Sequence, residues 1–437
     1  MNTAQFVMVF CLLFELNVSG ETLNETLKLT KENEAKEYQF GVWSTHSKTI
    51  AGNARLLVIG SPKDMKLQGS VDIFSRKQNK RIAKLRPPSS SQRQYFGWCV
   101  AVNDDFIVVG AWGVNRVYVY NASDPFELLH TLSGGGRFGW SCSIDQENTL
   151  VVGAPIYNNR RGAVFVYKLN NLLNEPMRTL QPNDFLVGDR FGDKVAITTN
   201  YIAAGTPDKG VYVFDKITDR VCKVEPQNED RAPSLAINDG RLFVGESSSN
   251  TVFIYTVNSS NACTLRHKVH RNVSDTKGFG GFGHTLAVSG NIMVVCNIFA
   301  ESNKGICYLY MFEEGDDKWR ELATLRPSDG IEGDYFGVSL AMDDGGTVIV
   351  GSRGKSQGYE AGAVYLYGIT NFTQRAQPTT TTATTQLPTT KTKNIYVLII
   401  SLISICIVAV LCICFVRHRR IRQRSPIQQN EMEAIYP

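Results

Sequence analysis

Cysteine is the residue type whose number and spacing most directly indicate covalent chemistry in this chain. Of ten cysteines, four lie in two apolar segments near the chain ends and six lie between these segments. An even number in an oxidising compartment permits three disulfides, with several connectivities. Cys296 and Cys307 end and begin neighbouring predicted strands and are the best pair. The other four cysteines occupy nearly equivalent places in successive repeats, which favours Cys99 with Cys142 and Cys222 with Cys263 but leaves other pairings open.

Asparagine in Asn-x-Ser/Thr sequences offers a second kind of modification, because such sequences accept N-linked glycans in secreted chains. Five of them lie after residue 20: Asn24, Asn121, Asn258, Asn272 and Asn371.

Recognisable motifs for catalysis and metal binding are missing from the sequence. It contains no Cys-x-x-Cys zinc spacing, no H-E-x-x-H and no P-loop. We therefore expect no catalytic residue, no metal site and no cofactor, and we predict that the protein is not an enzyme. Dispersed carboxylates that converge on one axis are the remaining catalytic alternative, because paired carboxylates can hydrolyse glycosidic bonds.

The elements that position these residues are repeated, since the dipeptide Phe-Gly recurs along the chain. It stands at Phe40, Phe96, Phe138, Phe191, Phe282 and Phe336. The interval between Phe191 and Phe282 is about twice the usual one and contains a degenerate copy, in which Ala232 and Pro233 replace Phe-Gly. The sequence therefore has seven units, whose starts lie 41 to 56 residues apart.

Each unit has the pattern of one propeller blade. Most units contain four short runs of β-branched and aromatic residues bounded by turn formers, which predicts four antiparallel strands per unit. A second glycine in most units, such as Gly153, would allow backbones to approach closely, and the Phe of Phe-Gly would fill the wedge between blades. The prediction is an all-β, seven-bladed β-propeller. A β-sandwich with repetitive turns is the alternative.

The two ends of the predicted ring are expected to join. The last unit lacks a fourth-strand segment, whereas residues 27–30 precede the first unit and belong to no other. We predict that this N-terminal strand closes the last blade and covers its exposed edge. An unpaired leader is the alternative.

The third unit carries a family resemblance. Phe-Gly at Phe138 is followed by Val-Val-Gly-Ala-Pro and then by Gly-Ala-Val-Phe-Val-Tyr. This pattern resembles the FG-GAP repeat of integrin α-subunit propellers over residues 21–369. The resemblance implies a seven-bladed propeller that binds adhesion ligands through its upper face.

The chain also departs from that family. The family's calcium loops, of D-x-D-x-D-G type, are replaced by short turns such as NDDF and INDG, so the resemblance implies no calcium in this chain. The family's leg domains are also missing, and we do not expect an integrin β-type partner.

Segments outside the repeats predict the cellular location. Residues 1–20 have the apolar core of a signal peptide, and residues 370–394 are a Thr- and Pro-rich stalk. Residues 395–416 are free of charged side chains and long enough for a transmembrane helix, and residues 417–437 form a basic tail. The positive-inside rule makes this tail cytoplasmic. The prediction is a single-pass type I plasma-membrane protein with the propeller, residues 21–369, outside the cell.

Strand threading assigns the glycosylation sites to faces of the propeller. Asn121, Asn258 and Asn371 follow third strands, and Asn24 precedes the closing strand, so these four share the face from which the chain leaves for the membrane. Asn272 alone decorates the opposite, upper face. Turns on the upper face contain residue types enriched at binding hot spots, and these are the candidate ligand-binding residues: Trp112, Tyr157, Arg160, Arg161, Phe299, Arg353 and Tyr359.

Three functions from different classes remain. The first is an integrin-α-like adhesion or recognition receptor that binds an extracellular protein or glycan through the upper face. The second is a structural surface-coat or scaffold glycoprotein, and the third is a propeller-based glycan-processing enzyme. Most of the formal net charge of +5 comes from the basic tail, so nothing indicates a nucleic-acid partner.

Overall fold

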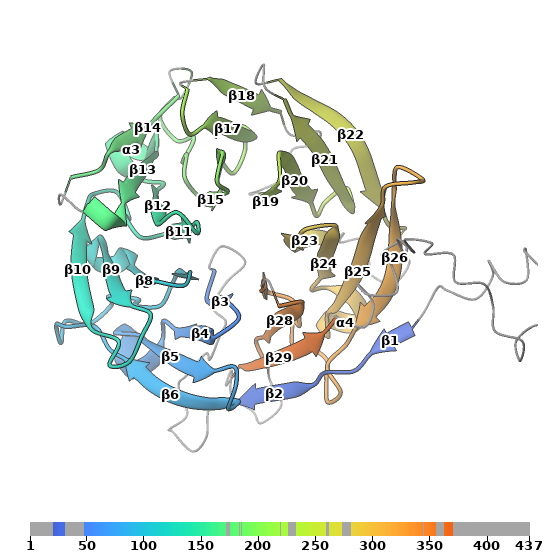
Figure 1. Cartoon of the computed structure of the whole chain (residues 1–437), viewed down its shortest axis with the longest axis horizontal. Coiled ribbons are helices and arrows are strands. Elements are labelled where there is room, and N and C mark those ends of the chain that lie inside the picture. Colours follow the sequence, from blue (N-terminus) through green and yellow to red (C-terminus); the bar gives the residue numbers. More distant parts are fainter. Residues whose placement is uncertain are drawn as a thin grey trace, which may run out of the picture. The chain divides into compact units, whose positions relative to one another are not determined.

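Seven β-sheets surround one axis in the computed structural model (Figure 1). The structure describes residues 21–30, 48–171, 175–182, 184, 186–218, 220–225, 233–258, 262–272, 281–343, 345–354 and 362–369. Each sheet is one blade, and we number the blades in chain order. The all-β, seven-bladed architecture predicted from the repeats is confirmed.

The first four blades each contain four consecutive strands, which run in order from the axis outward. Blade 1 comprises β3 (Ile50–Gly52), β4 (Leu56–Ser61), β5 (Ser70–Ser75) and β6 (Lys80–Leu85). Blade 2 comprises β7 (Val100–Val102), β8 (Phe106–Ala111), β9 (Arg116–Asn121) and β10 (Leu128–Ser133). Blade 3 comprises β11 (Ser141–Ile144), β12 (Thr149–Ala154), β13 (Ala163–Lys168) and β14 (Arg178–Leu180). Blade 4 comprises β15 (Lys194–Ile197), β16 (Tyr201–Gly205), β17 (Val211–Asp215) and β18 (Val221–Val224).

The last three blades include the two N-terminal strands. Blade 5, the degenerate repeat, comprises β19 (Ser234–Asn238), β20 (Arg241–Glu246), β21 (Thr251–Val257) and β22 (Cys263–His270). Blade 6 comprises β23 (Phe282–Ser289), β24 (Ile292–Asn297), β25 (Ile306–Glu313) and β26 (Lys318–Leu325), with β1 (Glu21–Leu23) added outside β26. Blade 7 comprises β27 (Ser339–Met342), β28 (Thr347–Ser352), β29 (Ala363–Gly368) and β2 (Leu27–Thr30).

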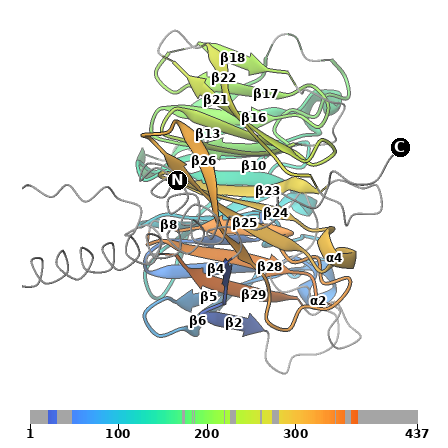
Figure 2. The same ribbon diagram turned by 90° about the vertical axis from the view of Figure 1, so that its right-hand side faces the viewer.

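Antiparallel pairing within the blades defines two faces of the ring. Turns between second and third strands, and loops from each fourth strand to the next blade, form the face that we call the upper face. The other turns form the lower face. Short helical turns mark several upper-face connections: α2 (Asp64–Leu67), η1 (Trp112–Val114), α3 (Tyr157–Arg160) and α4 (Ala300–Asn303). Figure 2 shows α2 and α4 on the same side of the ring. A further turn, η2 (Leu169–Asn171), follows the third strand of blade 3.

The central strands are apolar along their length because a neighbouring blade covers each of their two faces. Every residue of β4, β12 and β24 is buried. The outermost strands have one open side and therefore alternate, as in β22, where exposed positions flank half-buried ones.

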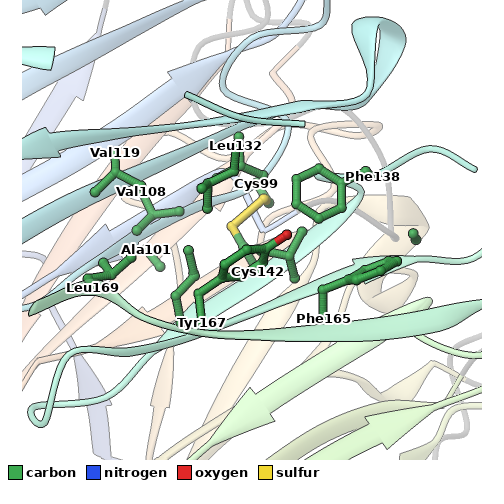
Figure 3. Packing of buried hydrophobic residues seen from close by; sticks show 14 of the residues in the cluster. Cys99, Ala101, Val108, Val119, Leu132, Phe138, Cys142, Phe165, Tyr167 and Leu169 are labelled. Atoms are coloured by element: carbon green, nitrogen blue, oxygen red, sulfur yellow. A yellow bond between two sulfur atoms is a disulfide. The ribbon is translucent and has the colours of Figure 1, made fainter. Parts of the chain in front are cut away.

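The hydrophobic core is divided into seven main clusters, each between two neighbouring blades. Phe138 is fully buried in the cluster between blades 2 and 3, beside Leu132 and Phe165 (Figure 3). The other Phe-Gly phenylalanines that the structure describes are also fully buried: Phe96, Phe191, Phe282 and Phe336. The predicted role of this Phe, to fill the wedge between blades, is confirmed.

The predicted close approach of backbones occurs between neighbouring blades. A Cβ atom added at Gly153 on β12 would lie 2.1 Å from the carbonyl oxygen of Gly192, the glycine of the next Phe-Gly. Gly192 itself has φ +87°, a conformation that residues with a Cβ rarely adopt. Both glycines are therefore required for blades 3 and 4 to pack.

A side-chain hydrogen bond reinforces the same contact. The hydroxyl of Ser141, at the start of β11, donates to the carbonyl of Gly192 at 2.7 Å, and Ser234 donates to Gly283 at 2.6 Å. In blade 4 the corresponding residue is Lys194, which pairs in register with Gly205 as Ser141 pairs with Gly153. Blade 4 therefore lacks this hydroxyl. The blade that follows it, blade 5, is the degenerate repeat in which Phe-Gly is replaced.

The N-terminal segment closes the ring as predicted. β2 pairs antiparallel with β29, with Leu27 opposite Leu366 and Thr30 opposite Ala363. Leu29 is buried in the cluster between blades 7 and 1. The pairing of β1 with β26, which is parallel, was not predicted. The N-terminal segment therefore links the outer edges of blades 6 and 7.

All three predicted disulfides are present. Cys296 and Cys307 join β24 to β25 within blade 6, with a Cα–Cα distance of 3.9 Å. The pairs Cys99–Cys142 and Cys222–Cys263 join neighbouring blades, each at a Cα–Cα distance of 5.9 Å. The first of these lies at the inner strands of blades 2 and 3, and Figure 3 shows it beside Phe138.

Several predictions fall outside the described residues. They concern Phe40, the signal peptide (1–20), the stalk (370–394), the transmembrane helix (395–416) and the tail (417–437). Among the residues that the structure describes, no helix is both long and apolar enough to cross a membrane.

Candidate ligand-binding face

Every described candidate for ligand binding lies on the upper face, and the structure places them in three groups. Trp112 begins η1 in blade 2, and Tyr157, Arg160 and Arg161 lie in or next to α3 of blade 3. Phe299 and Arg353 lie in the corresponding turns of blades 6 and 7. All of these turns therefore lie on the predicted face of the propeller. Tyr359 lies outside the described residues.

Trp112 belongs to an aromatic group that we call the tryptophan cluster: Tyr95, Trp98, Trp112, Arg137 and Trp140. The ring of Trp112 stacks on that of Tyr95, with centroids 4.6 Å apart and an interplanar angle of 5°. Trp98 lies 4.8 Å from Trp140 and 5.5 Å from Trp112. The four rings therefore form one continuous aromatic group over blades 2 and 3, in which Trp98 is buried and the other three rings are partly exposed.

A guanidinium group completes the tryptophan cluster. The guanidinium carbon of Arg137 lies 4.8 Å from the ring centre of Trp112 and 5.1 Å from that of Trp140. Each such cation–π contact contributes about 0.5–2 kcal/mol, depending on how far the pair is removed from water. The indole N–H of Trp112 is buried and has no hydrogen-bond partner among the described residues.

The repeat itself positions this cluster. Trp98 and Trp140 each follow a Phe-Gly, so they occupy the same place in adjacent blades. Their backbone N–H groups donate to the carbonyls of Tyr95 and Arg137, at 3.1 and 3.0 Å, which closes a tight turn in each blade. Tyr95 and Arg137 immediately precede Phe-Gly and have φ values of 55° and 64°. Side chains on both sides of Phe-Gly therefore meet on the upper face.

Phe299 and Arg353 lie in a second, smaller aromatic group. The ring of Phe299 is 5.8 Å from His284 and 6.4 Å from Tyr335, and Arg353 lies over Tyr335 at 5.9 Å. His284 follows Phe-Gly in blade 6, and Tyr335 precedes it in blade 7. The same two repeat positions thus build both aromatic groups.

An axial channel with a volume of about 470 Å³ is lined by the first strands of the blades. Lys48 and Lys194 stand near its upper end, where the surrounding protein removes water from the ammonium groups and lowers the pKa of both lysines. Asp145 and Asp239 follow first strands and lie at the lower end. Asp145 binds Lys216 at 2.6 Å. Within the described residues, no group of three or more His, Cys, Asp or Glu side chains could hold a metal ion.

The predicted glycosylation sites that the structure describes have exposed side chains. Asn121 ends β9 and Asn258 follows β21, so both lie on the lower face. Asn24 lies between β1 and β2, where the chain passes from blade 6 to blade 7, so strand pairing assigns it to neither face. Asn272 follows β22 at the upper face. Asn371 lies outside the described residues.

Sequence reasoning missed most of the tryptophan cluster, namely Tyr95, Trp98, Arg137 and Trp140. The signal was available in the repeat, because these residues flank the same dipeptide in two successive units. The prediction considered only the turns between second and third strands, and these turns contain Trp112 but not the other four residues of the cluster.

Comparison with known proteins supports the class of fold. The FG-GAP repeat family matches residues 80–123 and 319–367, which include Phe96-Gly97 and Phe336-Gly337. Two of the seven blades of the propeller therefore contain stretches that are similar to the FG-GAP repeat. No curated protein matches it by sequence.

Solved structures resemble the chain in fold alone. "Structure of U3-55K" matches with a TM-score of 0.56 and 10% identity, and the match covers 78% of this chain and 99% of that chain. "Crystal structure of RRP9 WD40 repeats" matches with a TM-score of 0.56 and 11% identity, covering 80% and 100%. A chain of "Crystal Structure of Mitotic Checkpoint Complex" matches with a TM-score of 0.55 and 15% identity, covering 79% and 92%.

Proposed function

We propose that this protein is a single-pass type I cell-surface glycoprotein that acts as an adhesion or recognition receptor. In this proposal the upper face of the propeller binds an extracellular protein or glycan, and the chain binds its ligand without catalysing a reaction. An integrin β-type partner is not part of the proposal.

The observation that carries the proposal is the tryptophan cluster on the upper face. Trp, Tyr and Arg are the side chains most enriched at binding hot spots, because they combine large apolar area with directional polar contacts. The buried indole N–H of Trp112 is a donor that a ligand acceptor could satisfy after a small rearrangement of the cluster.

The distribution of glycosylation sites agrees with this assignment. Asn121 and Asn258 lie on the lower face, whereas the tryptophan cluster lies on the upper face. Glycans on the lower face would leave the upper face accessible. The predicted stalk would follow β29, which ends at the lower face, so the upper face would point away from the cell.

The axial channel gives less support to the enzyme alternative. Asp145 and Asp239 are the carboxylates among its described lining residues, and Asp145 already neutralises Lys216. The tryptophan cluster supports the receptor instead, because Tyr95, Trp112 and Trp140 are partly exposed on the upper face around the buried Trp98.

The test is a binding screen with the full chain displayed on cells, against arrays of glycans and extracellular protein domains. We expect Trp112→Ala and Tyr157→Ala to weaken binding of the selected ligand by about tenfold or more, as hot-spot truncations do. Ile217→Ala is the matched control, because Ile217 is 90% exposed on the lower face. Surface staining and thermal unfolding would verify folding. Ligand binding unchanged in both upper-face variants would overturn the proposal.

A further inference from the structure

Four arginines gather on the upper face over blades 3 and 4, beside the tryptophan cluster. We call them the arginine patch: Arg137, Arg160, Arg161 and Arg190. They come from three separate connections, namely the two loops that precede Phe138 and Phe191 and the α3 turn. The repeat does not place an arginine at these positions in every blade. The patch is therefore a feature of blades 3 and 4 and not of the whole ring.

Backbone hydrogen bonds hold the three connections together. The N–H groups of Arg190 and Phe191 donate to the carbonyls of Arg160 and Arg161, both at 2.9 Å. On the other side of α3, the N–H of Ile156 donates to Gly136, next to Arg137, at 2.9 Å. The arginines are therefore carried by a fixed scaffold.

The positive charge of the patch is only partly neutralised. Burial is the largest cause that lowers the pKa of Arg137, and the charges of Arg160 and Arg190 lower it further, while Asp193 acts in the opposite direction. Asp189 is the other nearby carboxylate and accepts a hydrogen bond from the backbone of Leu186 at 2.8 Å.

The balance of charge favours an anionic ligand. Four arginines against Asp189 and Asp193 leave a net charge of +2. No ion pair joins any of the four guanidinium groups to a carboxylate in the portion of the chain that the structure describes. Guanidinium groups bind carboxylates through paired hydrogen bonds, so an acidic side chain could engage them with defined geometry.

Exposed aliphatic side chains adjoin the patch and narrow the class of ligand. Leu186 and Val187 are 63% and 65% exposed, in the loop whose Gly188 donates to the carbonyl of Arg160 at 3.2 Å. Large aliphatic groups this exposed gain from contact with apolar protein side chains. A polyanionic glycan offers no comparable apolar group and would be matched better by a longer basic stripe.

We propose that the arginine patch binds an acidic segment of a partner protein, with carboxylates on the guanidinium groups and an aliphatic or aromatic side chain against Leu186 and Val187. This inference rests on the proposed function, since it names the ligand chemistry of one sector of the same face.

The experiment selects peptides from a phage-displayed random dodecapeptide library on the full chain in detergent micelles. Wild type is compared with the double variant Arg160→Glu/Arg190→Glu. The control is Lys80→Glu, which makes the same charge change per site on the exposed start of β6, at the lower face. Circular dichroism verifies that each variant is folded. A fluorescent heparin oligosaccharide serves as a second probe of all three proteins.

We expect the selected peptides to be rich in Asp and Glu beside Leu, Ile, Val or Phe. Their affinity should fall at least about tenfold in the double variant, as when one partner of an interfacial charge pair is reversed, and should fall as salt rises. Leu186→Ser should weaken the same peptides, whereas Lys80→Glu should leave them unchanged.

Two results would overturn the inference. One is that the selected peptides are not enriched in Asp and Glu, or that they bind the double variant with the same affinity as wild type. The other is heparin binding that depends on the patch while the peptides are indifferent to it. If Trp112→Ala still abolished ligand binding on cells in either case, the proposed function would stand and only this inference would fail.

Discussion

At the scale of single residues, the buried phenylalanines pack against aromatic pairs on third strands. Phe96 lies 5.5 Å from Tyr118 and 6.4 Å from Tyr120, two positions apart on β9. Blade 5 has lost this phenylalanine but keeps Tyr255, which is 6% exposed on β21. Burial, and next the charge of Glu246, raise the pKa of Tyr255 to about 12. Removal from water disfavours the charged phenolate form, so the Tyr255 side chain ionises at a higher pH than a tyrosine in water.

This pKa predicts how stability depends on alkaline pH. A folded-state pKa raised above the unfolded value of about 10 contributes stability below pH 10 that is lost as pH rises through 12. Between pH 10 and pH 12 we expect the free energy of unfolding to fall less steeply in Tyr255→Phe than in wild type. The difference between the two slopes should be about 1.4 kcal/mol per pH unit. Urea unfolding at pH values from 8 to 12 measures the difference. Parallel curves for the two proteins would show that Tyr255 titrates normally.

At the scale of elements, each blade is fixed to the next by a contact between its second strand and the following Phe-Gly. The second-strand glycine has the same place in the sequence of most units, but its neighbour differs. A Cβ at Gly153 would meet the backbone of Gly192, whereas a Cβ at Gly205 would meet the side chain of Leu235 at 3.0 Å. The backbone cannot yield without separating two blades, and a leucine side chain can rotate.

The difference predicts unequal costs for the same substitution. Gly153→Ala should destabilise the protein by about 3 kcal/mol, the upper end of the usual cost of overpacking. Gly205→Ala should cost about 1 kcal/mol or less, because the clash is with a flexible methyl group. Guanidinium unfolding of both variants provides the comparison. Equal losses would mean that the contact between blades 3 and 4 is no tighter than that between blades 4 and 5.

Element order along the chain was accessible from the sequence because each repeat contains its own turn formers and alternating apolar runs. The degenerate fifth unit was also found, through its spacing, although Ala232 and Pro233 replace the defining dipeptide. The hydroxyl bond from Ser141 to Gly192 was not found, since it joins residues 51 positions apart in sequence. A local pattern carries no information about which carbonyl a serine will meet.

At the scale of the whole molecule, closure of the ring depends on a short N-terminal segment. β2 fills the edge of blade 7, and Leu29 packs with Val364 and Leu366 between blades 7 and 1. Without this strand, β29 would be an exposed edge and one side of the inter-blade cluster would be open to water. The stability of the last blade is therefore linked to the first described residues of the chain.

Two substitutions in the same strand test this dependence. Leu29→Asp places a charge in the inter-blade cluster and should destabilise the protein by about 3 kcal/mol or more. Lys28→Ala removes an ion pair with Asp329 at the partly exposed edge and should cost about 1 kcal/mol or less. Thermal unfolding and limited proteolysis would compare them, with early cleavage expected in blade 7 of Leu29→Asp. Equal behaviour of the two variants would show that β2 is dispensable for closure.

The sequence by itself determined the number of blades and the strand that closes the ring, and it favoured the three disulfide pairings that the structure then established. Each of these follows from periodicity, because equivalent positions in successive repeats must occupy equivalent places around one axis. Trp112 and Arg160 could be assigned to the upper face for the same reason.

Only the tertiary structure decided which upper-face residues meet. Tyr95 and Arg137 converge with Trp112 because they adopt left-handed conformations at the junction of blades 2 and 3. The position of β1 beside β26 was likewise undetermined, since a three-residue strand has no periodicity to read. Repetition specifies the ring, whereas contacts between unlike residues of neighbouring blades build the site, and those contacts depend on packing across the repeat boundary.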